Sequence, residues 1–389
     1  MKTRGVPDFL LLLLTALLVG FGITMVLSAS SIFALTSFAS NGCDYCNGDE
    51  LYFVKKQATW LFIGVIGMLF AMNIPFSFYK RNFLVIVLLS FFSLLLVLVP
   101  GIGYEANGAR SWFKIGSASI QPAEFAKLGL ILYLAAIIAK KGEGFRKMKT
   151  GLIPPLVITA IFFLLIFLQP DLGSAAILLG TAGIVMICGG ARFSHLFLLV
   201  VPISSLSLLS YITLKQHAWN RLTSFMDPWS DPLGKGYNMV QSLIAIAHGG
   251  LSGTGYGKSI QKYLYLPEAH TDFIFAIIAE ELGFIGTTIF LLVYLLFLLR
   301  GLTICLRCKD TFASLVGIGV VSMIGLQAII NIGGVTGTIP MTGVPLPFIS
   351  YGGSSLLVCL VSTGILLSVS REVSKQKIHE QMQARSYSA

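Results

Sequence analysis

The sequence predicts an all-α integral membrane protein with about ten transmembrane helices. Of the 389 residues, 55% are hydrophobic and only 11% are charged, and the mean hydropathy is +0.84. A surface this apolar cannot be kept in water. Runs of about 20 apolar residues recur along the chain, each long enough to cross about 30 Å of hydrocarbon as a helix. Helices are required because an open sheet edge would leave backbone groups unpaired in lipid.

The apolar runs place ten spans along one membrane domain that comprises residues 1–389. The first run follows Lys2 and Arg4 like a signal peptide, but it is longer than a typical signal-peptide core, so we expect it to remain uncleaved. Residues 214–270 are expected to form a long outer loop, and residues 371–389 a cytoplasmic tail. The spans are 8–28, 57–74, 82–99, 122–139, 154–169, 173–190, 194–213, 271–299, 312–332 and 351–370.

The distribution of basic residues sets the orientation. Most of the 27 Lys and Arg residues lie in segments that are cytoplasmic if the N-terminus is inside. The short outer loops hold only Lys55, Lys56, Arg110 and Lys114. This asymmetry follows the positive-inside rule. The net charge of +10 therefore reports orientation, and it does not indicate a nucleic-acid partner.

Two Cys-x-x-Cys pairs lie on opposite sides of the membrane. Cys43 and Cys46 are in the first outer loop, whereas Cys305 and Cys308 are cytoplasmic. They cannot combine into one zinc site. A local disulfide between Cys43 and Cys46 is left open for an oxidising exterior.

The polar residues cluster on the outer side, where ionisable groups near membrane depth mark function. The first cluster carries Arg110, Trp112 and Lys114, followed by Glu124 and Lys127 at the start of the fourth span. Glu124 and Lys127 stand three residues apart and so share a helix face. The simpler interpretation is an interfacial anchor with a local ion pair.

Acidic residues stand at two outer helix ends. Asp171 and Asp272 could each merely cap the helix that follows. Against a cap at Asp272, Thr271 already supplies a capping oxygen. Glu280 lies eight residues further along, about 12 Å deeper in a helix. Two acidic residues at depth favour a functional role.

The long outer loop is rich in glycine near its end. Residues 248–259 nearly match a Walker A loop, but Ser252 replaces its first glycine, no strand precedes it, and it faces away from cytosolic ATP. We therefore reject a nucleotide site. Glu268, His270 and Asp272 lack a strong metal-binding spacing.

The last polar cluster, residues 331–355, is dense in Pro, Gly and Ser and includes Ser350 and Ser354. Irregular backbone survives at membrane depth when it lines a cavity or is covered by protein. This segment therefore predicts a substrate cavity.

Five motifs in order resemble those of the FtsW/RodA/SpoVE (SEDS) family. They are NGARSW, QPAEFAK, QPDLG, LPEAHTDFIFAIIAEELG and the Gly- and Pro-rich segment that ends in SYGGSS. The sequence LPEAHTDFIF, with Val335-Thr-Gly before Pro340, resembles the FtsW branch more closely than the RodA branch. The Cys43/Cys46 insertion is outside the family pattern.

The resemblance implies a ten-helix peptidoglycan glycosyltransferase that polymerises lipid II, with inversion, on the outer face of the bacterial cytoplasmic membrane. It implies cytoplasmic termini, enrichment at the septum, and work with a class B penicillin-binding protein and other division proteins. It implies no organic cofactor and leaves a divalent cation, Mg²⁺ or Mn²⁺, open. The catalytic residue that it implies is Asp272.

The chemistry agrees with such residues. A carboxylate such as Asp272 can deprotonate the attacking sugar hydroxyl, and cations can neutralise the leaving pyrophosphate. We expect Arg110, Lys114 and Lys127 to bind the pyrophosphate and Glu124 and Asp171 to orient Lys127 or substrate. The expected substrate-binding set is completed by Trp112, His270, Glu280, Ser350 and Ser354.

Two other functions remain as alternatives. A lipid II flippase would also have about ten helices with broken segments, but the sequence has no evident inverted repeat and its polar residues lie on one side. A non-catalytic division scaffold should tolerate substitution of its outer polar residues.

Overall fold

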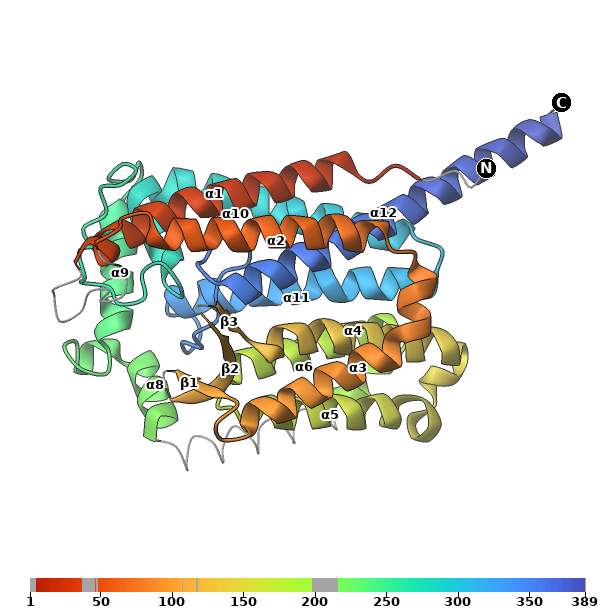
Figure 1. The fold of residues 1–389 in the computed structure, drawn as a ribbon, viewed down its shortest axis with the longest axis horizontal. Coiled ribbons are helices and arrows are strands. Elements are labelled where there is room, and N and C mark those ends of the chain that lie inside the picture. The colour runs from red at the N-terminus through yellow and green to blue at the C-terminus, as the bar shows by residue number, and fades with distance from the viewer. Residues whose placement is uncertain are drawn as a thin grey trace.

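The computed structural model describes residues 5–36, 46, 48–106, 108–116, 118–197 and 216–388. Its helices run side by side in one elongated bundle (Figure 1). The long helices are α1 (Phe9–Leu35), α2 (Tyr52–Asn73), α3 (Phe76–Leu98), α4 (Pro122–Lys141), α5 (Ile153–Phe167), α6 (Leu172–Cys188), α10 (Ile274–Arg307), α11 (Thr311–Val335) and α12 (Gly353–Ser388).

The helical membrane fold is confirmed. Eight helices in the described residues are long and apolar enough to cross a membrane, and Leu172–Cys188 is a shorter apolar helix. Most of the expected span at 194–213 lies outside the described residues. Three expected helix starts carry an aspartate cap: the side chains of Asp8, Asp171 and Asp310 accept hydrogen bonds from the first turns of α1, α6 and α11.

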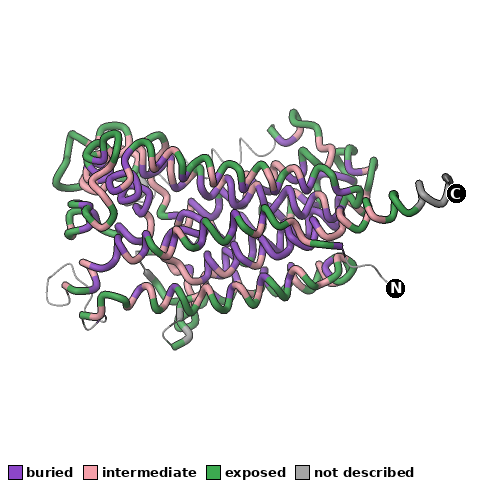
Figure 2. The backbone as a smooth tube through the Cα atoms, turned by 90° about the horizontal axis from the view of Figure 1, so that it is seen from above, coloured by how far each residue is buried: buried purple, intermediate pink, exposed green. Residues whose placement is uncertain are grey.

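The centre of the bundle is formed by α4, α11 and α12, which are mostly buried, whereas α2 and α3 are mostly exposed. Figure 2 shows this arrangement as buried backbone along the middle and exposed backbone outside. α12 packs on α2, α3 on α4, and α6 on α11. The exposed apolar side chains of α2 and α3 suit lipid.

One end of the bundle carries structure that the apolar pattern does not predict. Strands β1 (Tyr104–Ala106), β2 (Ala109–Ile115) and β3 (Ala118–Ile120) form a small antiparallel sheet in the order β1-β2-β3. The expected long outer loop contains helices α8 (Gln216–Met226) and α9 (Tyr237–Gly249). Figure 1 places α8, α9 and this sheet at the same end.

The two described chain ends lie at the opposite end of the bundle (Figure 1). α12 continues to Ser388, so the expected tail 371–389 extends the last span as a helix through all of its described residues. In the first outer loop, Cys46 is buried and disulfide-bonded. Its expected partner Cys43 lies outside the described residues.

We expect the end that carries α8 and α9 to face outward. A cysteine introduced at Leu233, whose side chain is exposed, in a chain without its native cysteines should react with an impermeant maleimide in intact cells. A cysteine at Met382 should react only after lysis, because the basic segments favour an inner α12 end. Labelling at Met382 but not at Leu233 in intact cells would reverse the orientation.

Candidate active site

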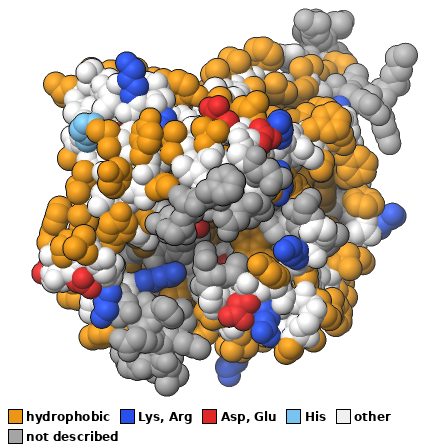
Figure 3. Space-filling view, turned by 60° about the vertical axis from the view of Figure 1, so that its left-hand side comes forward, with side chains coloured by type: hydrophobic (Ala, Val, Ile, Leu, Met, Phe, Trp, Pro, Cys, Tyr) orange, Lys and Arg blue, Asp and Glu red, His pale blue; other side chains and the backbone are white. Residues whose placement is uncertain are grey.

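A cavity of about 770 Å³ opens at the end of the bundle that carries α8 and α9. Figure 3 shows that end, with acidic and basic side chains around a hollow. The walls come from β2, the first turns of α4, α6 and α12, helix α8, and the segments before α10 and α12. The polar lining residues include Ser111, Gln121, Glu124, Asp171, Ser174, Arg221, Lys235, Glu268, Thr271, Asp272, Thr342, Ser354 and Ser355.

Asp272 stands just before α10 and does not cap it. The N-cap position is Phe273, and it has no side-chain capping bond. Thr271 does not cap the helix either, because its hydroxyl donates to Glu268 Oε2 at 2.7 Å. Both capping interpretations are therefore wrong. Within the described residues the carboxylate of Asp272 accepts no hydrogen bond, so it is free to accept a proton from a ligand.

The backbone around Asp272 leaves space for its carboxylate. Asn331 Nδ2 donates to the backbone oxygen of Asp272 at 2.8 Å and so fixes the start of α10. Gly343, at φ +71°, lies so close that a Cβ there would be 3.4 Å from Asp272 Oδ2. Glycine adopts this positive φ without steric cost. Because Gly343 has no side chain, the Asp272 carboxylate remains accessible from the cavity on that side.

The electrostatics of Asp272 suit a base that works near neutral pH. Burial, together with the nearby carboxylates of Glu268 and Asp171, raises the pKa of Asp272 to about 7, and the positive charge of Arg221 opposes this rise. A general base is most effective when its pKa lies near the working pH.

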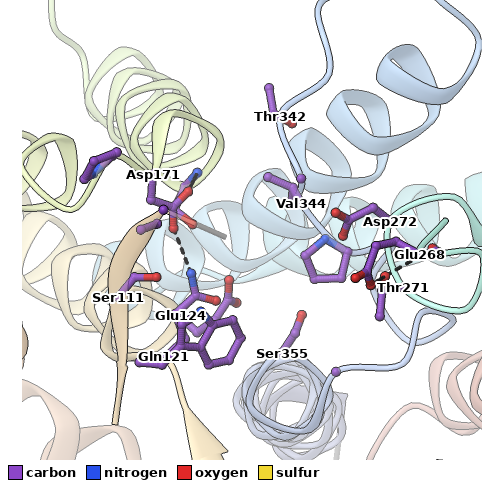
Figure 4. A pocket seen from close by; sticks show the side chains of 18 of the residues that line it. Ser111, Gln121, Glu124, Asp171, Glu268, Thr271, Asp272, Thr342, Val344 and Ser355 are labelled. Atoms are coloured by element: carbon purple, nitrogen blue, oxygen red, sulfur yellow. Dashed lines mark hydrogen bonds between the residues drawn. The ribbon is translucent and has the colours of Figure 1, made fainter. Parts of the chain in front are cut away.

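Opposite Asp272 the cavity wall is held by polar contacts (Figure 4). Asp171 caps α6 by accepting from Ser174 N at 2.9 Å, and its second oxygen accepts from Gln121 Nε2 at 2.7 Å. Asp171 is thus both a cap and a lining residue. Trp112 and Ser354 also line the cavity, as expected.

Glu124 and Lys127 form the expected local ion pair. Lys127 Nζ lies 2.8 Å from Glu124 Oε1, and both side chains are almost completely buried. Lys127 Nζ also donates to Gln327 Oε1 at 3.2 Å, and Gln327 in turn donates to Ser355 Oγ. Glu124 lines the cavity, whereas Lys127 lies behind it with its charge already balanced.

Two predicted cations lie beside the cavity and do not line it. Arg110 Nη2 is 3.4 Å from Glu105 Oε2. Lys114 Nζ lies 5.0 Å from the centre of the Tyr104 ring. Among the described residues, the cations that line the cavity are Arg221 and Lys235, which the sequence analysis missed.

His270 and Ser350 support the site from behind. The His270 ring packs among Phe33, Phe53 and Tyr351, and burial lowers its pKa to about 4, so it is neutral. Ser350 Oγ accepts from Leu346 N at 2.8 Å and thereby fixes the segment before α12.

Glu280 lies away from the cavity and anchors the segment before α10. Its carboxylate accepts hydrogen bonds from Ser259 Oγ and from Ile260 N, the latter at 2.9 Å, and it contacts His248 Nδ1. The neighbouring Glu281 accepts from Ser28 Oγ at 2.5 Å and lies 3.6 Å from Lys262 Nζ. These two carboxylates fix residues 248–262 against α10, next to its kink at Gly283.

The side chains that could bind a metal ion do not cluster in the described residues. In the part of the chain that the structure describes, no three His, Cys, Asp or Glu side chains lie close enough together to hold one. Glu268, His270 and Asp272 do not form such a group.

A polytopic helical bundle with a charged cavity at one end defines an integral membrane protein with a site suited to a polar ligand. The chain belongs to the FtsW/RodA/SpoVE family, since the family model described as cell cycle protein matches residues 8–375.

Relatives and solved structures agree along almost the whole chain. The stage V sporulation protein E of Bacillus subtilis is 44% identical over 94% of this chain and 97% of the relative. The probable peptidoglycan glycosyltransferase FtsW of Saccharophagus degradans is 39% identical over 95% and 94%.

Two solved structures are also similar. A chain from a peptidoglycan synthase complex that coordinates polymerization and crosslinking matches with a TM-score of 0.74 at 31% identity, over 94% of this chain and 98% of that one. The rod shape determining protein RodA of Thermus thermophilus matches with a TM-score of 0.68 at 29% identity, over 94% and 97%.

Proposed function

We propose that this protein is a peptidoglycan glycosyltransferase that polymerises lipid II into glycan strands at the outer face of the bacterial cytoplasmic membrane. The observation that carries the proposal is the Asp272 carboxylate, free of hydrogen bonds within the described residues, in a cavity that also presents two cations. Relatives named as probable peptidoglycan glycosyltransferases support it.

The geometry supports an inverting displacement with one base. Asp272 takes the proton of the acceptor sugar hydroxyl as its oxygen forms a bond to the anomeric carbon of the donor. The bond from that carbon to the pyrophosphate breaks, and the leaving group keeps the electron pair. Arg221 and Lys235 neutralise its growing charge, so no general acid is needed. Asp171 and Glu124 orient the substrate from the facing wall.

Purified protein incubated with labelled lipid II, with and without its partner, tests this function. Glycan polymer is the expected product. Movement of lipid II across a bilayer without polymer would favour the flippase alternative. A protein that does neither, and whose outer polar residues tolerate substitution, would be a scaffold.

We infer that the partner is a class B penicillin-binding protein and that the protein works with other division proteins at the septum, its termini being cytoplasmic. The similarity to a chain of a peptidoglycan synthase complex supports a partner that crosslinks the glycan. The FtsW-named relatives support a septal role. A role in the spore wall is a second candidate, because the stage V sporulation protein E is 44% identical. Depletion should cause filamentous growth in the first case and a sporulation defect alone in the second.

The pH dependence of polymerisation should follow Asp272. We expect kcat/KM to fall as the pH drops below about 7, because a protonated carboxyl cannot accept the hydroxyl proton. Glu268→Gln removes a charge that raises the Asp272 pKa, so this acidic limb should move to lower pH. Arg221→Gln should move it to higher pH. Initial rates on both sides of pH 7 measure the shifts.

Glu105→Gln is the matched control for Glu268→Gln, because Glu105 is exposed and does not line the cavity. Glu105→Gln should leave the acidic limb of the kcat/KM profile at the same pH. An acidic limb that stays fixed in both cavity variants would show that another group controls the profile.

We expect the pyrophosphate to depend on Arg221 and Lys235 rather than on Arg110 and Lys114. Each Gln substitution at Arg221 or Lys235 should lower kcat/KM by about tenfold or more, since a cation aimed at developing charge is lost. Rates should be compared at a pH above the Asp272 pKa, so that the base is ionised in every variant. Arg110→Gln and Lys114→Gln, which remove the same charge, should remain close to the unchanged protein. If Arg110→Gln and Lys114→Gln lowered kcat/KM more than the other two variants, the pyrophosphate would be bound by these two residues of β2 instead.

A further inference from the structure

A second cavity lies at the end of α10 opposite to Asp272, between the chain's N-terminal segment, α10 and α12. Its volume is about 290 Å³, close to the roughly 300 Å³ at which small-ligand pockets begin. The residues that matter for its chemistry are Asp8, Phe9, Arg300, Arg307 and Lys377. Nothing in the proposed polymerase reaction uses this cavity.

One wall of the cavity is fixed by the N-terminal segment. The backbone N–H of Asp8 donates to Ser370 Oγ at 2.9 Å, and Arg371 Nε donates to Gly5 O at 3.1 Å. Gly5 approaches α12 so closely that a Cβ there would lie 2.0 Å from the Arg371 oxygen. The wall is therefore formed before any ligand arrives.

The cavity holds more positive than negative charge. Its carboxylate, Asp8, is bound by Arg300 through Nε at 3.1 Å and Nη2 at 2.6 Å. Arg307 and Lys377 are exposed and form no ion pair within the described residues. The neighbouring Glu380 is bound by Lys309. Arg307 and Lys377 act electrostatically on Asp8 and Glu380 without forming an ion pair with either. Among the described residues, three cations and one carboxylate line the cavity, and this excess of positive charge favours an anionic ligand.

The rim of the cavity is apolar and lies where membrane spans end. Phe9, in the first turn of α1, is 75% exposed, and Val6, in the segment before α1, is 69% exposed; both line the cavity. A free phosphate ion would contact the cations and leave these side chains in water. A phospholipid would cover them with its acyl chains, and basic pockets between helices on the cytoplasmic side suit anionic headgroups.

We propose that this cavity binds the phosphate headgroup of an anionic phospholipid, with Arg307 and Lys377 on the phosphate and Val6 and Phe9 against the acyl chains. The site is independent of glycan polymerisation. The ligand class is defined by a phospholipid headgroup with net negative charge. Phosphatidylglycerol has such a headgroup, whereas in phosphatidylcholine the choline ammonium balances the charge of the phosphate.

Native mass spectrometry of the delipidated full chain, titrated with each of these two lipids, tests the proposal. The unchanged protein should bind phosphatidylglycerol about tenfold or more tightly than phosphatidylcholine, given the attraction of each basic residue for an anionic lipid. Arg307→Gln with Lys377→Gln should reduce this preference to near unity. Arg307→Lys, which keeps the charge, should retain most of it.

The matched control is Lys140→Gln with Lys147→Gln, which removes the same charge from exposed residues that do not line the cavity. It should keep the lipid preference. An equal loss in the control would show diffuse attraction and overturn the proposal. Inorganic phosphate alone should compete weakly. Complete displacement of the lipid by it would also overturn the proposal, because the site would then recognise phosphate without acyl chains.

Discussion

Asp272→Asn is expected to abolish glycan polymerisation while the protein stays folded in the membrane. Asparagine keeps the size of aspartate but cannot take up the hydroxyl proton, and base catalysis contributes roughly 10²–10⁴ in rate. Since Asp272 makes no capping bond to α10, the substitution removes no helix contact. Polymer formed from labelled lipid II by the purified variant measures the loss.

Asp171→Asn is the matched comparison. Asp171 lines the same cavity, yet its two oxygens accept from Ser174 N and Gln121 Nε2. Asparagine can still cap α6, so this variant should retain far more activity than Asp272→Asn. Elongation by Asp272→Asn at a rate close to that of the unchanged protein would remove the base from the mechanism and reopen the flippase and scaffold alternatives.

Lys127→Ala is expected to destabilise the protein by about 3–5 kcal/mol, because it leaves the buried Glu124 without its ion-pair partner. One oxygen of Glu124 already lacks a hydrogen bond within the described residues. Thermal unfolding of the detergent-solubilised protein, followed through a lipid-facing fluorophore or by aggregation, measures the effect.

The double variant Glu124→Gln with Lys127→Met separates charge from packing. It removes both charges and keeps much of the side-chain volume, so it should recover most of the lost stability. An exposed pair of the same spacing, Glu372 and Lys375 at 3.7 Å, is the control, and Lys375→Ala should cost less than about 1 kcal/mol. A small loss in Lys127→Ala would show that Glu124 is solvated through the cavity.

The membrane helices could be predicted from sequence because a span is recognised from a run of about 20 apolar residues, whatever the helix packs against. The same rule cannot detect α8 and α9, which are short and partly polar, or the sheet of residues 104–120. These elements form on the outer surface, where water satisfies the backbone and no long apolar run is needed.

The sequence could predict which carboxylates line the candidate site, but it could not predict which cations do so. Asp171, Asp272 and Glu124 stand beside helix starts, so the topology alone brings them to one end. Arg221 lies on α8, inside a loop whose path over the cavity depends on tertiary contacts. The prediction that Glu280 binds substrate was wrong about its position, because depth along a helix does not determine which side of the helix the carboxylate faces. It turns toward the loop at Ser259, whereas Asp272 precedes the helix altogether.

The acidic pair at Glu280 and Glu281 bears on how the chain is made. Within the described residues, every hydrogen-bond or ion-pair partner of these carboxylates, from Ser28 to Lys262, lies earlier in the sequence than α10. A ribosome therefore delivers these two acids after their hydrogen-bond and ion-pair partners, whereas Lys127 follows its own partner Glu124 by one helical turn. The order of synthesis spares the insertion machinery from placing a lone buried charge in lipid while its counterpart is still untranslated.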